Sequence, residues 1–141
     1  MPTPIEVKLR NAALATPALT ALLGSSPFRW GDTQHVQNDP FPSVEAFQVS
    51  AVRPYVFYGR NPLCQYRVQI NIWGGFFESG ADAANTVRNA ILTFLDTFSA
   101  VSNTAAYPNR IVNERRALYP QTDGAVYQRM LDVMIWSDDT L

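Results

Sequence analysis

The segment from Tyr66 to Trp73, reading YRVQINIW, limits the possible folds of this chain more than any other stretch. Every second side chain is apolar, and the side chains between them are polar: the apolar set is Tyr66, Val68, Ile70 and Ile72, and the polar set is Arg67, Gln69 and Asn71. A period of two predicts a β-strand with one buried face. Gly74 and Gly75 follow, and we expect them to end this strand shortly before a helix.

Helices are predicted on both sides of this strand. Near the N-terminus, Thr3 and Pro4 form a capping signal for a helix that runs to about Ala15, and Thr16-Pro17 repeats the signal for a short helix closed by Gly24. After the strand, Ser79 to Asp82 matches a capping pattern, so a longer helix is expected from Asp82 to Phe98. This helix has one apolar stripe, formed by Ala84, Val87, Ile91, Phe94, Leu95 and Phe98. The opposite side is polar and should face water.

Further strands are indicated on both sides of the central one. Residues 28–30 and 54–59 are short β-rich runs, the second leading toward Tyr66. Residues 110–119 and 125–136 are two extended runs joined around Asp123-Gly124, which is a hairpin signal. The last run is partly apolar on both faces, with Met130, Met134 and Trp136 on the second one. Such a strand lies in the centre of its sheet, or another subunit covers its second face. Arg115 and Arg116 point to opposite faces of their strand, so one should be exposed to solvent and the other paired with an acid such as Asp132 across the hairpin.

These elements predict an α+β fold in a single domain, residues 1–141. We expect an antiparallel sheet of about four main strands, with two helices packed on one face.

The segment 31–53 interrupts this pattern, because it has no clear periodicity and is long for a loop. Two interpretations remain open. It forms an extra hairpin, residues 44–52, folded back on its own domain, or it is an arm that contacts a partner.

Composition and motifs exclude several classes of function. Twelve acidic and eleven basic residues give a net charge of −1, which is not the electrostatic pattern of a nucleic-acid-binding protein. No run approaches the ~20 apolar residues of a membrane span, and the N-terminus does not resemble a signal peptide, so we expect a cytoplasm-like setting and no membrane partner. The single Cys64 is expected to be a small buried hydrophobe.

Residue patterns typical of catalysis or cofactor binding are not evident. Gly74-Gly75 matches neither a P-loop nor a dinucleotide-binding pattern, and His35 is the only histidine. We therefore expect no catalytic, cofactor or metal site, and no enzyme activity.

Taken in order, the elements resemble the tail-completion, or tail-terminator, proteins of long-tailed bacteriophages. The resemblance depends mainly on Val68 to Trp73 followed by an Ala-rich helix, and on the ending YQRMLDVMIW, residues 127–136. The segment 31–53 is longer than its counterpart in that family and departs from the pattern.

The resemblance implies a structural virion protein that assembles as a ring, commonly a hexamer, at the head-proximal end of the tail. There it would end polymerisation of the tail tube, and its partners would be copies of itself, the tail tube protein and the head-tail connector, with DNA only as passing cargo. Assembly would take place in the host cytoplasm. A head-completion or other minor tail protein is the nearest alternative. A small-molecule-binding module or enzyme is the alternative from another class.

Such a protein acts through surfaces, and the candidate interface residues fall into three sets. Phe41, Val44 and Phe47 are hypothesised to pack on an adjacent subunit or on the tail tube protein. Arg67, Gln69 and Asn71 are candidates for the channel wall or a subunit seam. Met130, Met134 and Trp136 occupy the second face of the last strand.

Overall fold

The structure is a computed structural model that describes residues 5–23, 42–52, 55–56, 59–60, 63–98, 109–121 and 124–138. Its main element is a four-stranded antiparallel sheet with the strand order β1-β4-β6-β5. These strands are β1 (Ser43–Val52), β4 (Leu63–Phe76), β5 (Arg110–Gln121) and β6 (Gly124–Asp138). The helices are α1 (Ile5–Leu14), α2 (Pro17–Leu23) and α3 (Phe77–Thr97). The predicted α+β class with about four main strands is confirmed.

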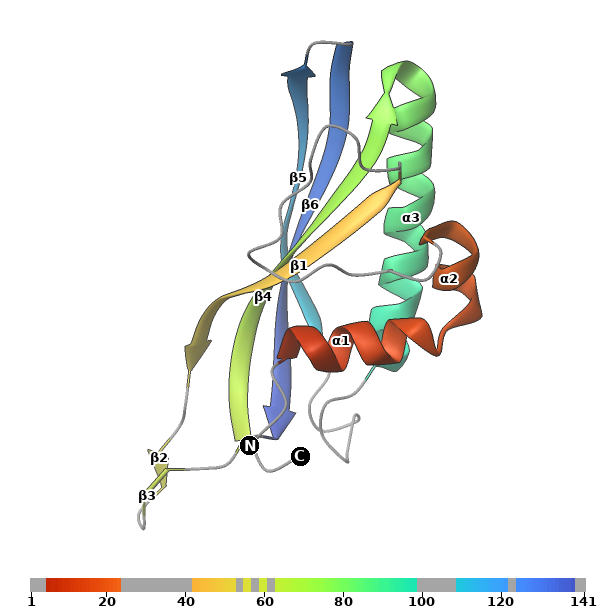
Figure 1. Ribbon diagram of the computed structural model, residues 1–141. Coiled ribbons are helices and arrows are strands. Elements are labelled where there is room, and N and C mark those ends of the chain that lie inside the picture. Colours follow the sequence, from red (N-terminus) through yellow and green to blue (C-terminus); the bar gives the residue numbers. More distant parts are fainter. Residues whose placement is uncertain are drawn as a thin grey trace.

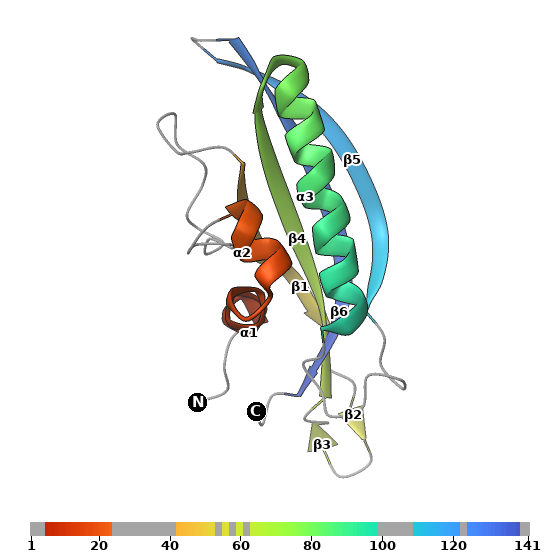
Figure 2. The same cartoon turned by 90° about the vertical axis from the view of Figure 1, so that its right-hand side faces the viewer.

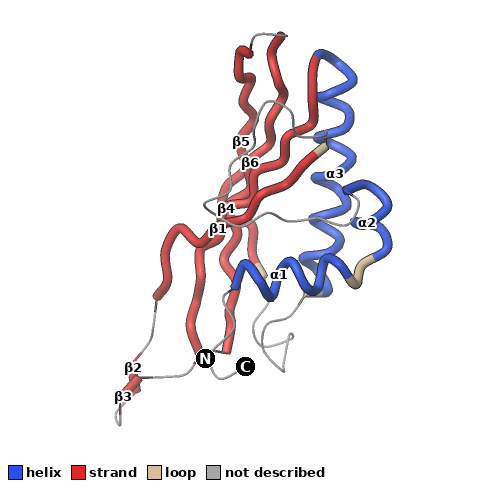
Figure 3. Tube along the Cα trace, in the orientation of Figure 1, coloured by secondary structure: helices blue, strands red, loops and turns tan. Residues whose placement is uncertain are grey.

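The helices lie together on one face of the sheet, and α3 runs along β4 and β6 (Figures 1 and 2). Figure 3 shows the resulting two layers, with helices on one side and strands on the other. The last strand, β6, is central, because β4 and β5 pair with it on either side. Its inner-face residues are buried under the helices, whereas Met130, Met134 and Trp136 on the other face are only partly buried.

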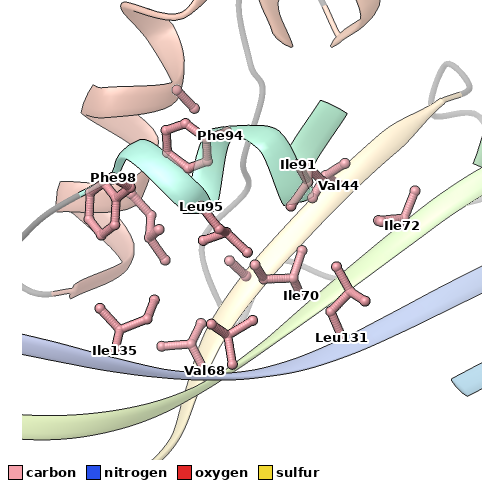
Figure 4. Close-up of a cluster of buried hydrophobic side chains, with 14 of the residues drawn as sticks. Val44, Val68, Ile70, Ile72, Ile91, Phe94, Leu95, Phe98, Leu131 and Ile135 are labelled. Atoms are coloured by element: carbon pink, nitrogen blue, oxygen red, sulfur yellow. The ribbon is translucent and has the colours of Figure 1, made fainter. Parts of the chain in front are cut away.

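The core is formed where the α3 stripe meets the inner face of the sheet. The six stripe residues predicted from sequence are all buried, between 0 % and 8 % exposed. Figure 4 shows Ile91 and Leu95 of α3 beside the side chains of the sheet, with Phe94 and Phe98 in the same cluster. The sheet side chains labelled there are Val44, Val68, Ile70, Ile72, Leu131 and Ile135. Ile5 and Leu9 of α1 and Leu19 of α2 complete the cluster.

The N-terminal helices follow the sequence prediction closely. α1 ends at Leu14 and α2 begins at Pro17. The Thr16 hydroxyl, predicted as a cap for α2, donates to the Ala12 carbonyl at the end of α1, at 2.9 Å. Proline fits the first turn of α2 because its missing N–H has no partner there.

The junction between β4 and α3 differs from the prediction. Gly74 and Gly75 do not end the strand, which continues through a bulge to Phe76, and α3 starts at Phe77 rather than after a cap at residues 79–82. Gly75 has φ of 121°, a backbone conformation that glycine adopts readily. A Cβ at Gly74 would lie 2.0 Å from the Gly80 carbonyl oxygen. The glycines therefore let strand and helix approach closely instead of separating them.

Residues 42–52 of the segment 31–53 are among the described residues. Residues 43–52 form one continuous strand, β1, that pairs with β4 at the sheet edge, so the predicted hairpin of residues 44–52 is wrong. The expectation that residues 44–52 fold back on their own domain is confirmed, because β1 is part of the main sheet. The run 54–59 was expected to be one strand; instead the short strands β2 (Tyr55–Val56) and β3 (Gly59–Arg60) pair with each other away from the main sheet (Figure 1). Residues 28–30, His35 and Phe41 lie outside the described residues.

Candidate subunit and partner interface

The sheet face opposite the helices, called the open face below, collects most of the candidate interface residues. Alternation along β4 buries Val68 and Ile70 beneath α3, so Arg67, Gln69 and Asn71 project from the other side. The register of β6 places Met130 opposite Asn71 and Met134 opposite Arg67. Trp136 pairs with Gln65 further along the same two strands. Thus six of the nine sequence candidates share one surface.

Hydrogen bonds link the polar side chains of the open face across three strands. The Gln69 amide donates to Asn71 Oδ1 at 2.8 Å and lies 3.5 Å from the Met130 sulfur. Asn71 Nδ2 donates to Glu45 Oε1 of β1 at 2.9 Å. Asn71 is 6 % exposed and Glu45 4 % exposed. Asn71 is therefore a buried, partnered amide, not the solvated side chain that its position in the alternation indicates.

A salt bridge crosses the open face next to this network. Arg67 Nη2 lies 2.8 Å from Asp132 Oδ2. The Asp132 side chain is 6 % exposed and that of Arg67 is 44 % exposed. The predicted partner of Asp132, Arg115 or Arg116, is wrong, because β4 rather than β5 supplies the arginine. Both Arg115 and Arg116 are exposed.

The three candidates from segment 31–53 separate in the structure. Val44 is 1 % exposed and packs in the core of its own domain, so its side chain is not available to a neighbouring subunit. Phe47 is in β1, where it pairs with Gln69 of β4. The Phe47 side chain is outside the described part of the chain, and so is the whole of Phe41. Glu45 and Asp132 were not among the sequence candidates. Their positions opposite Asn71 and Gln69 become visible only when the strand register is known.

A second surface feature lies on the helix side of the sheet, where α3 begins and the β5-β6 hairpin ends. It is a pocket of about 250 Å³. Its lining includes Ala81 and Ala84 of α3, Arg116 and Leu118 of β5, and Tyr127 and Arg129 of β6. The sequence patterns do not predict this pocket. We call it the arginine pocket, since Arg116 and Arg129 face each other directly across the two strands.

One carboxylate organises the charges beside this pocket. Glu114 accepts from Arg88 at 2.6 Å and 2.9 Å, through both carboxylate oxygens, and from Arg129 Nη1 at 3.1 Å. The hydrogen bond from Arg88 is the main reason that the pKa of Glu114 is lowered, with smaller contributions from the charges of Arg88 and Arg129 against the opposing effect of burial. The same bond raises the pKa of Arg88. Two arginines thus share one acidic partner.

Within the described part of the chain, His, Cys, Asp and Glu side chains form no cluster of three that could hold a metal ion. Cys64 is buried, as predicted. None of the helices in the described ranges is both long and apolar enough to span a membrane.

Comparison with protein families decides what kind of molecule carries these surfaces. Residues 7–138 match the family of the tail completion protein gp17. The chain belongs to this family of bacteriophage tail completion proteins. The match covers nearly the whole chain, including residues 31–53, and confirms the resemblance stated from sequence. A search of curated proteins finds no match.

Membership assigns this tail completion protein a structural role in phage tail assembly, as a component of the virion. Its work is therefore done by contact surfaces, and the open face and the arginine pocket are the two described surfaces with distinctive chemistry.

Proposed function

We propose that copies of this protein form a ring, with a hexamer as the expected size, that caps the tail tube at its head-proximal end. The ring stops tube polymerisation and presents a surface to the head-tail connector. The tail tube protein is the partner below it, and DNA passes through it as cargo. The family match supports the role in tail completion. The ring and the position at the head-proximal end are the proposed additions.

The observation that carries this proposal is the chemistry of the open face. Its centre is polar, linked by hydrogen bonds and held in fixed geometry by Glu45, Asn71 and Asp132, which are all buried. Met130, Met134 and Trp136 lie in the same face and are only partly buried. A rigid face that mixes apolar and hydrogen-bonding groups is typical of protein interfaces. We assign it to the seam between subunits or to the wall of the channel.

Electron microscopy of phage lysates made without this protein tests the proposed role. Tails much longer than those of the wild-type phage are expected, because nothing ends tube growth. Tails of normal length that fail to join heads would contradict the terminator role and favour a head-completion function. Complementation with the wild-type chain should restore uniform tails and serves as the control.

A variant of the open face tests whether this surface takes part. Gln69→Arg places a long charged side chain at the centre of the face and should prevent restoration of tail length. Asn85→Arg introduces the same side chain at an exposed position of α3 and should complement normally. Both purified variants should show cooperative thermal unfolding, which separates lost assembly from lost folding. Normal complementation by a folded Gln69→Arg protein would show that the open face is not an essential interface.

A further inference from the structure

The arginine pocket carries an unbalanced positive charge. Arg116 and Arg129 are cross-strand partners, and like charges placed directly opposite each other destabilise a sheet. Glu114 compensates Arg129, but it also receives both bonds from Arg88. Among the described residues, Arg116 has no acidic partner within salt-bridge distance, and it is exposed at the pocket. A group with negative charge bound here would relieve the repulsion between the two arginines.

The size and lining of the pocket indicate what kind of group this is. The pocket has about 250 Å³, slightly below the roughly 300–1,000 Å³ that small-molecule sites usually enclose. Leu118, which is 53 % exposed, and Tyr127 add apolar surface beside the guanidinium groups. An acidic peptide segment with a neighbouring apolar residue matches this combination better than a free anion does.

The chain itself contains such a segment. Asp138-Asp139 is the only pair of consecutive acidic residues in the sequence, and Thr140 and Leu141 follow it. A subunit cannot place this segment in its own pocket. Roughly 30 Å of extended strand separates Arg129 from Asp138 at about 3.3 Å per residue, and the next three residues span only about 10 Å. β6 therefore contributes Tyr127 and Arg129 to the pocket near its start and ends at Asp138, the first residue of the acidic segment.

We propose that the arginine pocket of one subunit binds the acidic segment 138–141 of a second copy of this chain. Such a contact joins different surfaces of the two copies, so it is head-to-tail, and it closes into a ring when the rotation between copies permits. The proposal rests on the ring described under Proposed function and gives that ring a specific contact. Arg116 and Arg129 supply the positive charge, and Leu118 and Tyr127 supply the apolar surface.

The test is fluorescence anisotropy with the full-length protein and a labelled peptide of residues 137–141, amidated at its C-terminus so that its charge comes from the two aspartates. Arg116→Glu should weaken binding about tenfold or more, whereas Arg115→Glu should leave it nearly unchanged. Arg115 is the matched control, because it is equally exposed and adjacent but belongs to the opposite face of β5. A peptide with both aspartates replaced by asparagine should bind as weakly as the wild-type peptide binds Arg116→Glu.

Several results would overturn the proposal. They are the absence of binding to the wild-type chain at up to about 1 mM protein, equal weakening by both arginine variants, and equal binding of the asparagine peptide. Binding of a short single-stranded oligonucleotide in an Arg116-dependent manner, without peptide binding, would reassign the pocket to nucleic acid. Arg116→Gln removes the positive charge without introducing a negative one, so its affinity for the peptide should lie between those of the wild type and Arg116→Glu. This variant keeps the test valid if Arg116→Glu does not fold.

The peptide measurement uses no phage tails, so its outcome is independent of the proposed function. Overlong tails without peptide binding would leave the terminator role intact and remove this contact. If the peptide binds but phage made without this protein still has tails of normal length, the contact between copies would stand and the terminator role would be wrong.

Discussion

At the scale of single residues, Glu114 is the group with the clearest electrostatic role. It holds Arg88 of α3 against β5 and offsets the charge of Arg129 on β6. Its side chain is 26 % exposed, so solvent screens part of this interaction. Glu114→Gln should destabilise the protein by about 1 kcal/mol at pH 7. Chemical denaturation of the variant and the wild type measures this difference.

The same pair predicts how stability depends on pH. The pKa of Glu114 is lower in the folded protein than in the unfolded chain, where it is about 4.3. The stabilisation is therefore fully present above the unfolded value and is lost as the pH falls through the folded value. The difference between wild type and Glu114→Gln should shrink below about pH 4. Asp96→Asn, an exposed change on α3, is the control and should show little difference at either pH. A Glu114→Gln deficit that persisted unchanged in acid would contradict this account.

Which individual residues could be predicted from sequence depended on how local their environment is. The α3 stripe was identified completely, because helical periodicity alone decides which residues face the sheet. The partner of Asp132 and the burial of Asn71 were missed, because both depend on strand order and register. Arg67 comes from β4, which is distant from Asp132 in sequence but adjacent in the sheet. Alternation indicates which face a side chain occupies, but it does not show what else lies on that face.

At the scale of elements, the junction of β4 and α3 depends on close contact between glycines. A Cβ on Gly80 would lie 2.1 Å from the Gly75 carbonyl oxygen, which is backbone and cannot move aside easily. In an ordinary helix, replacing glycine by alanine stabilises by up to ~1 kcal/mol. Here Gly80→Ala should instead destabilise by about 1–3 kcal/mol.

The midpoint of thermal or urea unfolding shows whether Gly80→Ala lowers or raises the stability of the protein. Asn85→Ala, an exposed helical position in α3, is the control and should be neutral or slightly stabilising. An increase in stability for Gly80→Ala would mean that strand and helix are not in close contact at this junction. From sequence alone these glycines indicate the end of a strand, because a glycine that ends a strand and a glycine that permits close packing cannot be distinguished without the neighbouring element.

The C-terminal end of α3 is closed by the side chain of Asn109, which immediately precedes β5. Asn109 Nδ2 donates to the carbonyls of Leu95 and Phe98, at 2.9 Å and 2.8 Å. These carbonyls belong to the group that a helix end leaves without internal partners. Asn109→Ala should therefore cost about 1–2 kcal/mol of stability, and Asn113→Ala, at an exposed position of β5, should cost far less. Hydrogen exchange provides the specific measurement: amides in the last turn of α3 should exchange faster in Asn109→Ala only. Unchanged exchange there would contradict the capping role.

Segment 31–53 shows why element boundaries were harder to predict than element types. Residues 43–52 lack strict alternation, because a bulge between Gln48 and Ser50 shifts the register of β1 against β4. Such an irregularity hides the period of two that identifies a strand. The strand became recognisable only through its pairing with β4, the most regular segment of the chain.

At the scale of the whole molecule, the architecture separates folding from assembly. The helices and the inner face of the sheet form the core (Figures 1 and 2). The open face and the arginine pocket lie outside this core, and they are the surfaces to which we assign the proposed contacts with other molecules. The family and the fold class could be predicted from apolar spacing, because that spacing reflects the core. The pocket could not, because residues 81–84, 116–118 and 127–129 meet only after the hairpin packs beside α3.

We propose that this protein forms a ring on the tail tube, and cryo-electron microscopy of purified tails would show such a ring. We expect one ring of copies at the head-proximal end, with the open face at the seam or lining the channel. We also expect density for residues 138–141 of each copy in the arginine pocket of the next. A single copy at that end, density along the length of the tube, or a ring whose open face points to solvent would contradict the proposal.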